Sequence, residues 1–213
     1  MKVLIVISSK SPNPYLYNCI EMLYKIQIDS LHFYKICVID SDSDDLSEYN
    51  KISDDFPYVE INFIKNKHYE YGAWKYSQIQ YPDYDIYFCL QDTMFLTNKI
   101  DLSVINDTTV FTWHNHSGYF SDITLKHEGI LYLKDTNLYY NYLIDTYFNL
   151  AYGNIFIVNN NIIKDIFNTF NIPSINKEGS RIYERNFGLY FIIKNINTID
   201  LSSYLIKYHG NRN

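Results

Sequence analysis

The sequence predicts one α/β domain, with a mostly parallel central sheet flanked by helices and a mixed second half. Three observations lead to this prediction. Strand-like and helix-like runs alternate through the first half, as they do where right-handed crossovers join parallel strands. Three of the strand-like runs end in polar or acidic turns. The 213 residues, of which 47% are hydrophobic, suffice for one domain with a substantial core.

In the first half, expected strands alternate with expected helices. The strands are short apolar runs, which are typical of strands buried on both faces of a sheet. The helices repeat apolar residues every three or four positions. From the N-terminus we expect a strand at 3–8, a helix at 15–28, a strand at 34–39, a helix at 46–52, a strand at 59–64, a helix at 71–80 and a strand at 85–90.

The second half has no regular alternation. Strands are expected at 109–113, 129–133 and 153–158, and helices at 135–150, 161–170 and 180–195. Asp135 is a suitable N-cap for the first of these helices. The tail at 199–208 is expected to be extended.

The polar turns in the first half carry the residues with the clearest chemistry. In an open parallel sheet, ligands bind outside the carboxyl ends of the strands. Acidic and amide side chains gathered there suit a nucleotide together with a divalent cation. In chain order the turns are Asp40-Ser41-Asp42-Ser43-Asp44-Asp45, Asn66-Lys67-His68-Tyr69-Glu70-Tyr71-Gly72-Ala73-Trp74 and Gln91-Asp92-Thr93.

In their order and spacing, these turns resemble three motifs of the family 2-type glycosyltransferases with the GT-A fold. The first fits the D-x-x-S-x-D turn of that family, and Asn66 through Ala73 looks like its N-x-x-x-x-x-G-A segment. Leu90-Gln91-Asp92 occupies the place of the D-x-D metal motif, with one acid missing. The resemblance covers most of the chain. By overall impression and size, the chain also looks like the small GT-A domain of a chlorella-virus capsid glycosyltransferase.

The resemblance implies a single Rossmann-like GT-A domain over residues 1–213, with a nucleotide-binding half to about residue 98 and an acceptor-binding half after it. It implies a metal-dependent enzyme that moves a sugar from a nucleoside-diphosphate donor, first of all a UDP-sugar, to a hydroxyl of a glycan or glycoprotein. The cofactor would be Mn²⁺ or Mg²⁺. A capsid glycoprotein would be the acceptor if the viral resemblance holds.

Two other functions stay open on this scaffold. The missing acid allows a non-catalytic carbohydrate-binding domain, because a fold does not determine function. A nucleotidyltransferase shares the strand–helix start, but it would need a loop rich in Gly, Arg and Lys after the first strand. The segment at 8–13 contains a single lysine, so this reading ranks last.

Charge and cysteine content narrow the class of protein. The net charge is −6 and the basic residues form no cluster, which argues against nucleic acid as a partner. A bridging cation would reconcile this acidity with an anionic diphosphate. Three cysteines in apolar runs indicate reduced thiols and hence a cytoplasmic location, the host cytoplasm if the protein is viral. No apolar stretch approaches the roughly 20 residues of a membrane span.

By the resemblance, Asp92 is the main metal ligand and Asp40 binds the uracil or ribose of the donor. A turn or cap role is the alternative for Asp92, and an Asx-turn is the alternative for Asp40. His209 would be a further metal ligand, with a frayed terminus as the alternative. The remaining residues assigned to the donor are Ser8, Asp42, Lys67, Tyr69, Gly72 and Gln91, among which Asp42 could equally be a turn residue.

The acceptor side is assigned to a late strand end and a late helix. Trp113 would stack on a sugar face, while His114 or Asn115 would bond its hydroxyls. Glu184 would be the general base that removes the acceptor proton. The alternative places Glu184 on a solvated helix face, paired with Arg181 or Arg185.

Overall fold

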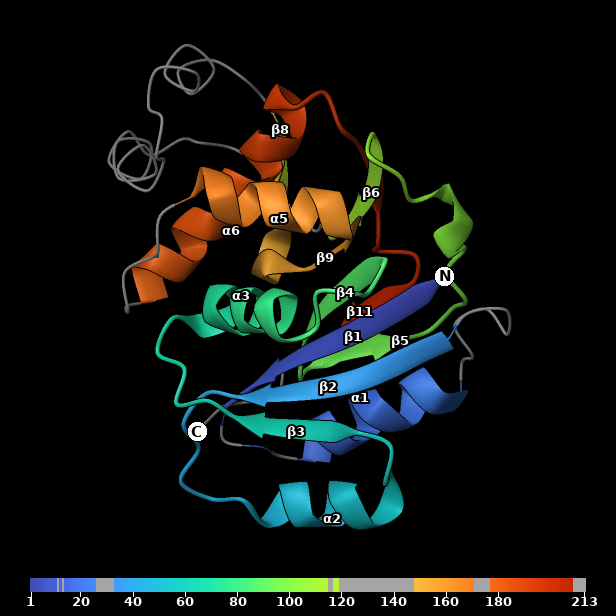
Figure 1. The fold of residues 1–213 in the computed structure, drawn as a ribbon, viewed down its shortest axis with the longest axis vertical. Helices are drawn as coiled ribbons and strands as arrows, with labels where there is room; N and C mark the ends of the chain where they lie inside the picture. The colour runs from blue at the N-terminus through green and yellow to red at the C-terminus, as the bar shows by residue number, and fades with distance from the viewer. Residues whose placement is uncertain are drawn as a thin grey trace.

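A seven-stranded sheet forms the middle layer of the structure, with helices on both of its faces (Figure 1). The computed structural model describes residues 1–10, 12, 14–25, 33–114, 117–118, 148–170 and 177–208. The strand order is β10-β6-β9-β4-β1-β2-β3. In chain order, these strands are β1 (Lys2–Ser9), β2 (Phe33–Asp40), β3 (Glu60–Phe63), β4 (Ile86–Gln91), β6 (Thr109–Thr112), β9 (Phe156–Asn159) and β10 (Asn197–Asp200).

All neighbouring strands of this sheet are parallel except β9, which runs antiparallel to β4 on one side and to β6 on the other. The first four strands stand in the order 3-2-1-4, which is the arrangement of the nucleotide-binding half of doubly wound folds. The prediction of a mostly parallel sheet with a mixed second half is therefore confirmed.

Within the described ranges, five helices cover the two faces. On one face lie α1 (Pro14–Lys25) and α2 (Ser47–Asp55), and on the other lie α3 (Tyr69–Gln80), α5 (Asn160–Thr169) and α6 (Lys177–Ile193) (Figure 1). The side chains of β1 show how one strand serves both layers. Val3, Ile5 and Ile7 pack with α1 and α2, whereas Leu4 and Val6 pack with the helices opposite. A strand buried on both faces is continuously apolar for this reason.

Shorter strands form two further two-stranded sheets, β11-β5 and β7-β8. In β5 (Met94–Leu96) and β11 (Leu205–Lys207), Lys207 pairs with Met94 in an antiparallel ladder. The amide of Tyr208 then donates to the carbonyl of Thr93 at 2.9 Å, so the tail lies beside the turn that follows β4. The other small elements are β7 (Ser117–Gly118), β8 (Phe148–Asn149), η1 (Leu102–Val104) and η2 (Tyr152–Asn154).

The elements expected in the first half are all present, but two expectations for the second half are wrong. A helix does not run to Leu150, because Phe148–Asn149 form β8. The strand expected from Gly153 begins only at Phe156. Gly153 and Asn154 have φ angles of 65° and 56°, which a β-strand does not accommodate. The strand expected at 129–133 lies outside the described residues.

The core contains the residues for which packing was predicted. Cys19, Cys37 and Cys89 are buried free thiols, and Trp74 is fully buried with its Nε1 donating to the carbonyl of Asn154 at 3.1 Å. Trp74 therefore packs in the core and is not available to stack on a nucleotide base. None of the helices in the described ranges has the length and apolar character needed to cross a bilayer.

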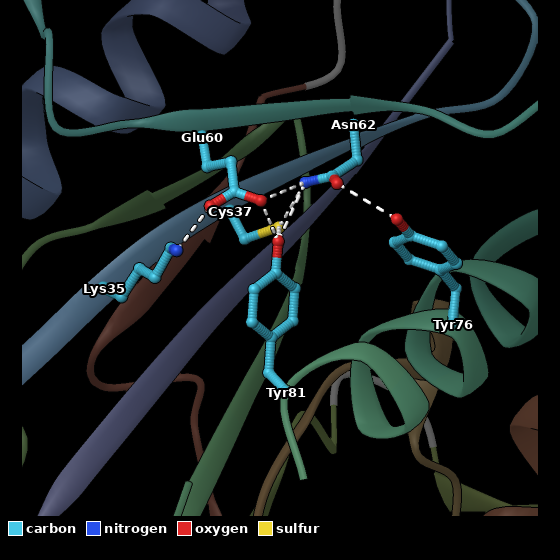
Figure 2. A network of polar contacts seen from close by, with 6 residues as sticks. All are labelled: Lys35, Cys37, Glu60, Asn62, Tyr76 and Tyr81. Carbon is cyan, nitrogen blue, oxygen red and sulfur yellow. Dashed lines mark hydrogen bonds and ion pairs between the residues drawn. The ribbon is translucent and has the colours of Figure 1, made fainter. Parts of the chain in front are cut away.

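A polar network ties the edge strand β3 to β2 and to the end of α3 (Figure 2). Tyr81 donates to Glu60, which also pairs with Lys35. Asn62 Nδ2 donates to Tyr81 Oη at 3.1 Å, and Tyr76 donates to Asn62 Oδ1 at 3.1 Å. Burial would raise the pKa of Glu60, but the hydrogen bonds from Lys35 and Tyr81 outweigh burial and lower it. The network therefore anchors the C-terminal end of α3, whose N-terminal end faces the candidate site.

Candidate functional site

The ends of β1, β2 and β4 meet at one edge of the sheet, as the polar turns predicted. Ser8 is in register with Gln91 on one side and with Ile39 on the other. Beyond the strands, the amide of Asp92 donates to the carbonyl of Ser8 at 3.1 Å, and the amide of Ser41 donates to the carbonyl of Ser9 at 2.9 Å. The first and third polar turns therefore lie side by side.

Asp92 occupies the turn between β4 and β5 and is only 2% exposed. Ser9 Oγ donates to Asp92 Oδ2 at 3.0 Å. A β-strand follows this turn, so a helix-capping role for Asp92 is excluded. The neighbouring Thr93 Oγ1 is buried and has no hydrogen-bond partner within the described residues.

The carboxylate of Asp92 and the hydroxyls of Ser9 and Thr93 provide oxygen ligands that fit one side of a divalent cation site. In the described ranges, no three side chains of His, Cys, Asp or Glu come together in a way that could hold an ion. Mg²⁺ is nevertheless commonly held by one or two carboxylates together with ligand phosphates and water. Asp92 therefore fits a cation that binds together with a diphosphate. His209 lies outside the described residues.

The carboxylate of Asp40 accepts hydrogen bonds from its own turn and from α2. It is 2% exposed and accepts hydrogen bonds from Tyr49 Oη at 2.6 Å, from the Ser43 amide at 3.0 Å and from the Ser43 hydroxyl. The turn-forming alternative describes this side chain well, and a nucleoside would have to share or replace one of these bonds. Asp42 lies exposed in the same turn with a φ of 67°.

Asn66 joins the second polar turn to the first. Its Nδ2 donates to the carbonyl of Tyr69 at 2.6 Å and to Ser41 Oγ at 3.1 Å, and its Oδ1 accepts from the His68 amide at 2.9 Å. Tyr69 and Lys67 are both exposed beside it. A Cβ on Gly72 would come within 1.9 Å of Asn66 Oδ1. The glycine is thus required by the Asn66 side chain.

Replacing Gly72 by alanine should destabilise the protein by about 1–3 kcal/mol, the usual cost of forcing an extra methyl group into a packed site. The sign is informative, because alanine in a helix is ordinarily favoured over glycine by about 0.5–1 kcal/mol. Urea denaturation measures the effect. In an Asn66→Ala background the same change should cost much less. An equal cost in both backgrounds would mean that Asn66 is not the obstacle.

A second group of polar residues connects β4 to α3, η2 and α6. Gln91 Nε2 donates to Glu70 Oε1 at 2.7 Å and to the carbonyl of Gly153 at 3.1 Å. The amide of Gly153 donates to Glu184 Oε1 at 3.0 Å. One side-chain amide and one glycine thus link carboxylates from two different helices.

Glu184 is held in an environment that disfavours its charge. Burial, followed by the negative charge of Glu70, raises the pKa of Glu184 to about 7, against the opposing effects of the Gly153 amide, Arg185 and Lys207. Glu184 is half-buried, and its carboxylate faces η2 rather than solvent alone. The side chain of Arg181 lies outside the described residues.

The predicted acceptor residues stand at the end of β6. Trp113 is 4% exposed and packs against Tyr152 with ring centroids 5.2 Å apart. Lys207 Nζ lies 5.8 Å from the centroid of the Trp113 ring and 5.4 Å from that of Tyr152. Trp113 therefore offers little ring surface for a sugar and instead supports a lysine ammonium.

His114 lies next to Trp113 at the end of β6. Its backbone amide donates to Asp200 Oδ1 at 3.0 Å. Burial lowers the pKa of His114, although the charge of Asp200 opposes the shift. Its Nε2 is buried and has no hydrogen-bond partner among the described residues. Asn115 lies outside them.

Sequence reasoning missed Glu70 and Gly153. Glu70 sits inside the second polar turn, but the motif there directs attention to Asn66 and Gly72. Its signal was an acidic residue directly before an expected helix, a place where a negative charge is favourable. Gly153 precedes a buried strand, where a glycine often marks a positive φ.

Comparisons with known proteins bear on the fold. No protein-family model and no curated protein matches the sequence. Among solved structures, S. aureus TarS superimposes with a TM-score of 0.58 at 14% identity over 96% of this chain. TarS 1–349 gives 0.55 at 14% identity, and its complex with UDP gives 0.54 at 12% identity, again over 96% of this chain.

The chain spans 36% of the length of TarS and 60% of its 1–349 piece. At such low identity the likeness concerns the fold. Together with the strand order, it shows that the described residues adopt the Rossmann-like α/β fold of GT-A glycosyltransferases.

Proposed function

We propose that this chain is a metal-dependent glycosyltransferase that transfers a sugar from a UDP-sugar to a glycan hydroxyl. One observation carries the proposal. Glu184, whose pKa is about 7, is connected through Gly153 and Gln91 to the strand end that bears Asp92. The proposed base and the proposed metal ligand are thus connected by hydrogen bonds at one end of the sheet. The structure of TarS 1–349 in complex with UDP supports a uridine nucleotide as the ligand of this fold.

Each residue would have a defined task. Asp92 would hold Mn²⁺ or Mg²⁺, which stabilises the charge of the leaving diphosphate when it is bound. Glu184 would take the proton from the acceptor hydroxyl as that oxygen attacks the sugar carbon. Lys207 would add positive charge on the side of Trp113 and Tyr152. His209 remains part of the proposal as a further metal ligand.

The uracil and ribose of the donor would lie at the strand ends that carry Asp40, Ser8 and Gln91. Asp40 would meet the nucleoside by exchanging one of its turn bonds, and Ser8 and Gln91 would flank it. Asp42, Lys67, Tyr69 and Gly72 complete the proposed donor set. His114 Nε2, with Asn115 beyond it, would meet the acceptor.

Finer points of function follow from the resemblance in sequence. A glycoprotein acceptor, a role in viral capsid glycosylation, action in the host cytoplasm and the division of the chain at about residue 98 all stay proposals. A non-catalytic carbohydrate-binding domain is the second candidate. It is favoured by the single acid in the Leu90-Gln91-Asp92 segment and by the internal engagement of Asp40.

Mn²⁺ and UDP together should raise the melting temperature, whereas either alone should have a smaller effect. The reason is that an acidic strand edge needs a cation between it and an anionic ligand. Binding to the native state stabilises by about 2.7 kcal/mol at a hundred-fold excess over Kd. Differential scanning fluorimetry with UDP, Mn²⁺ and EDTA in all combinations measures the effect.

The same experiment separates the two candidate functions. Equal stabilisation by UDP in EDTA would exclude the metal bridge. Stabilisation by oligosaccharides but not by UDP, with no release of UDP from UDP-sugars, would favour the binding domain.

A further inference from the structure

Glu70 is the second residue of α3, and its carboxylate collects hydrogen bonds from three other elements. Gln91 Nε2 of β4 donates to Oε1 at 2.7 Å. Ser180 Oγ of α6 donates to Oε2 at 3.0 Å, and Asn154 Nδ2 of η2 lies 3.5 Å from the same oxygen. Within the described ranges no Lys or Arg forms an ion pair with Glu70. This anion is therefore held by neutral donors.

The surroundings of the Gln91 side chain determine which way its amide faces. One terminal atom of the amide lies between Glu70 Oε1 and the carbonyl of Gly153, both of which can only accept. That atom must be the nitrogen, and both of its hydrogens are then used. The amide oxygen of Gln91 is the atom left for a ligand, one residue from Asp92.

Glu70 also forms a hydrogen bond with α6. Its bond with Ser180 joins the first turn of α3 to the helix that carries Glu184. The amide of Gly153 holds Glu184, while the carbonyl of Gly153 receives the Gln91 nitrogen that Glu70 orients. Displacing Gln91 would thus disturb Gly153, the residue whose amide binds Glu184.

We propose that Glu70 is a positioning residue for the proposed transfer: it orients Gln91 so that the amide oxygen faces the donor, and it fixes α6 relative to β4. This inference rests on the proposed function. A carboxylate suits the role because it can only accept hydrogen bonds and so admits a single orientation of its partner. A glutamine at this position could present either end of its amide, and Gln91 could then rotate.

Removing the charge of Glu70 should also change the pKa of Glu184. Among the described residues, four groups act on that carboxylate: Glu70 from α3, Arg185 from α6, Lys207 from β11 and the amide of Gly153. Glu70 raises the pKa of Glu184, so a neutral side chain at position 70 lowers it. The acid limb of the rate profile then moves to lower pH.

The test compares Glu70→Gln with Ser180→Ala. Both variants weaken the contact between α3 and α6, but only the first removes the charge and frees Gln91. We expect Glu70→Gln to lower kcat/KM for the UDP-sugar by roughly 10- to 100-fold, in the range of a charge-assisted hydrogen bond. The acid limb should shift to lower pH. Ser180→Ala should keep both the limb and the KM close to wild type.

A structural role would look different. Equal losses of melting temperature in both variants, with unchanged KM and pH profile, would overturn the proposal. A second measurement does not need activity: the pH dependence of unfolding, taken as the difference between each protein and its Glu184→Gln derivative, reports the pKa of Glu184. If wild type transfers no sugar, the proposed function fails, but this difference still decides whether Glu70 acts on Glu184. An unchanged difference in Glu70→Gln would count against it.

Discussion

Asp92→Ala should abolish sugar transfer while leaving the protein folded. The lost carboxylate would hold the cation that stabilises the leaving diphosphate, an effect worth several kcal/mol. That loss corresponds to a rate reduction of roughly 10³-fold or more. The fold should persist because Asp92 lies in the turn between β4 and β5, beyond the apolar run of the strand. UDP release from UDP-sugars in the presence of Mn²⁺ measures the effect, and circular dichroism checks the fold.

Two matched variants identify the cause. Asp92→Asn keeps the size of the side chain and an acceptor for Ser9 Oγ but removes the charge, so it should be nearly as inactive. Ser9→Ala removes the hydrogen bond of 3.0 Å and keeps the carboxylate, so it should retain most of the rate. Near-normal transfer by Asp92→Ala would place the metal site elsewhere in the chain.

Glu184→Gln should slow acceptor-dependent transfer by roughly 10²- to 10⁴-fold, the usual contribution of general base catalysis. Glutamine keeps the oxygen that accepts from the Gly153 amide but cannot take up a proton. The pKa of Glu184 is about 7, so wild-type activity should fall as the pH drops below this value. Donor binding, measured by calorimetry with UDP and Mn²⁺, should hardly change.

Although Glu184→Gln should lower the rate, it should raise the stability of the native state above the pKa of Glu184. The pKa of Glu184 is raised from 4.5 to about 7 on folding, first of all by burial. A raised pKa stabilises the native state fully below the unfolded value, and this stability is lost as the pH rises through the folded value. The melting temperature of Glu184→Gln minus that of wild type should therefore be larger at pH 8 than at pH 5. A mutant that loses stability at pH 8 and keeps its rate would have lost a structural residue.

The anomeric configuration of the product completes this test. Inversion together with a slow Glu184→Gln supports the base role. Retention together with an active mutant removes Glu184 from the mechanism, because a retaining transferase needs no acceptor base of this kind.

The strand ends of the first half could be predicted because each depends on a short stretch of sequence. An apolar run followed by Asp40 or by Gln91-Asp92 indicates both the strand and the polar edge. The hydrogen bond from Tyr49 to Asp40 was harder to predict from sequence, because it requires α2 to pack back on β2. The network of Glu70, Gln91 and Glu184 could not be predicted, because it joins residues that are even further apart in the chain.

Local pattern also failed where the backbone takes a rare conformation. Because Gly153 and Asn154 have positive φ angles, β9 begins only at Phe156. In this conformation the amide of Gly153 donates to Glu184 of α6 and its carbonyl accepts from Gln91 of β4. The pKa of Glu184 results from that packing, so a helical spacing of residues could suggest only a surface position.

The place of β9 has a consequence for how the chain reaches this fold. On the ribosome, β4 and β6 emerge well before β9, which finally separates them. Until then the inner edge of β4 presents unpaired backbone groups next to some of the most apolar side chains of the protein. Such an edge can pair with β6 out of turn or with another chain. The sheet is complete only when the distant β9 pairs with both strands. We therefore expect the protein to fold slowly and its nascent chain to bind chaperones.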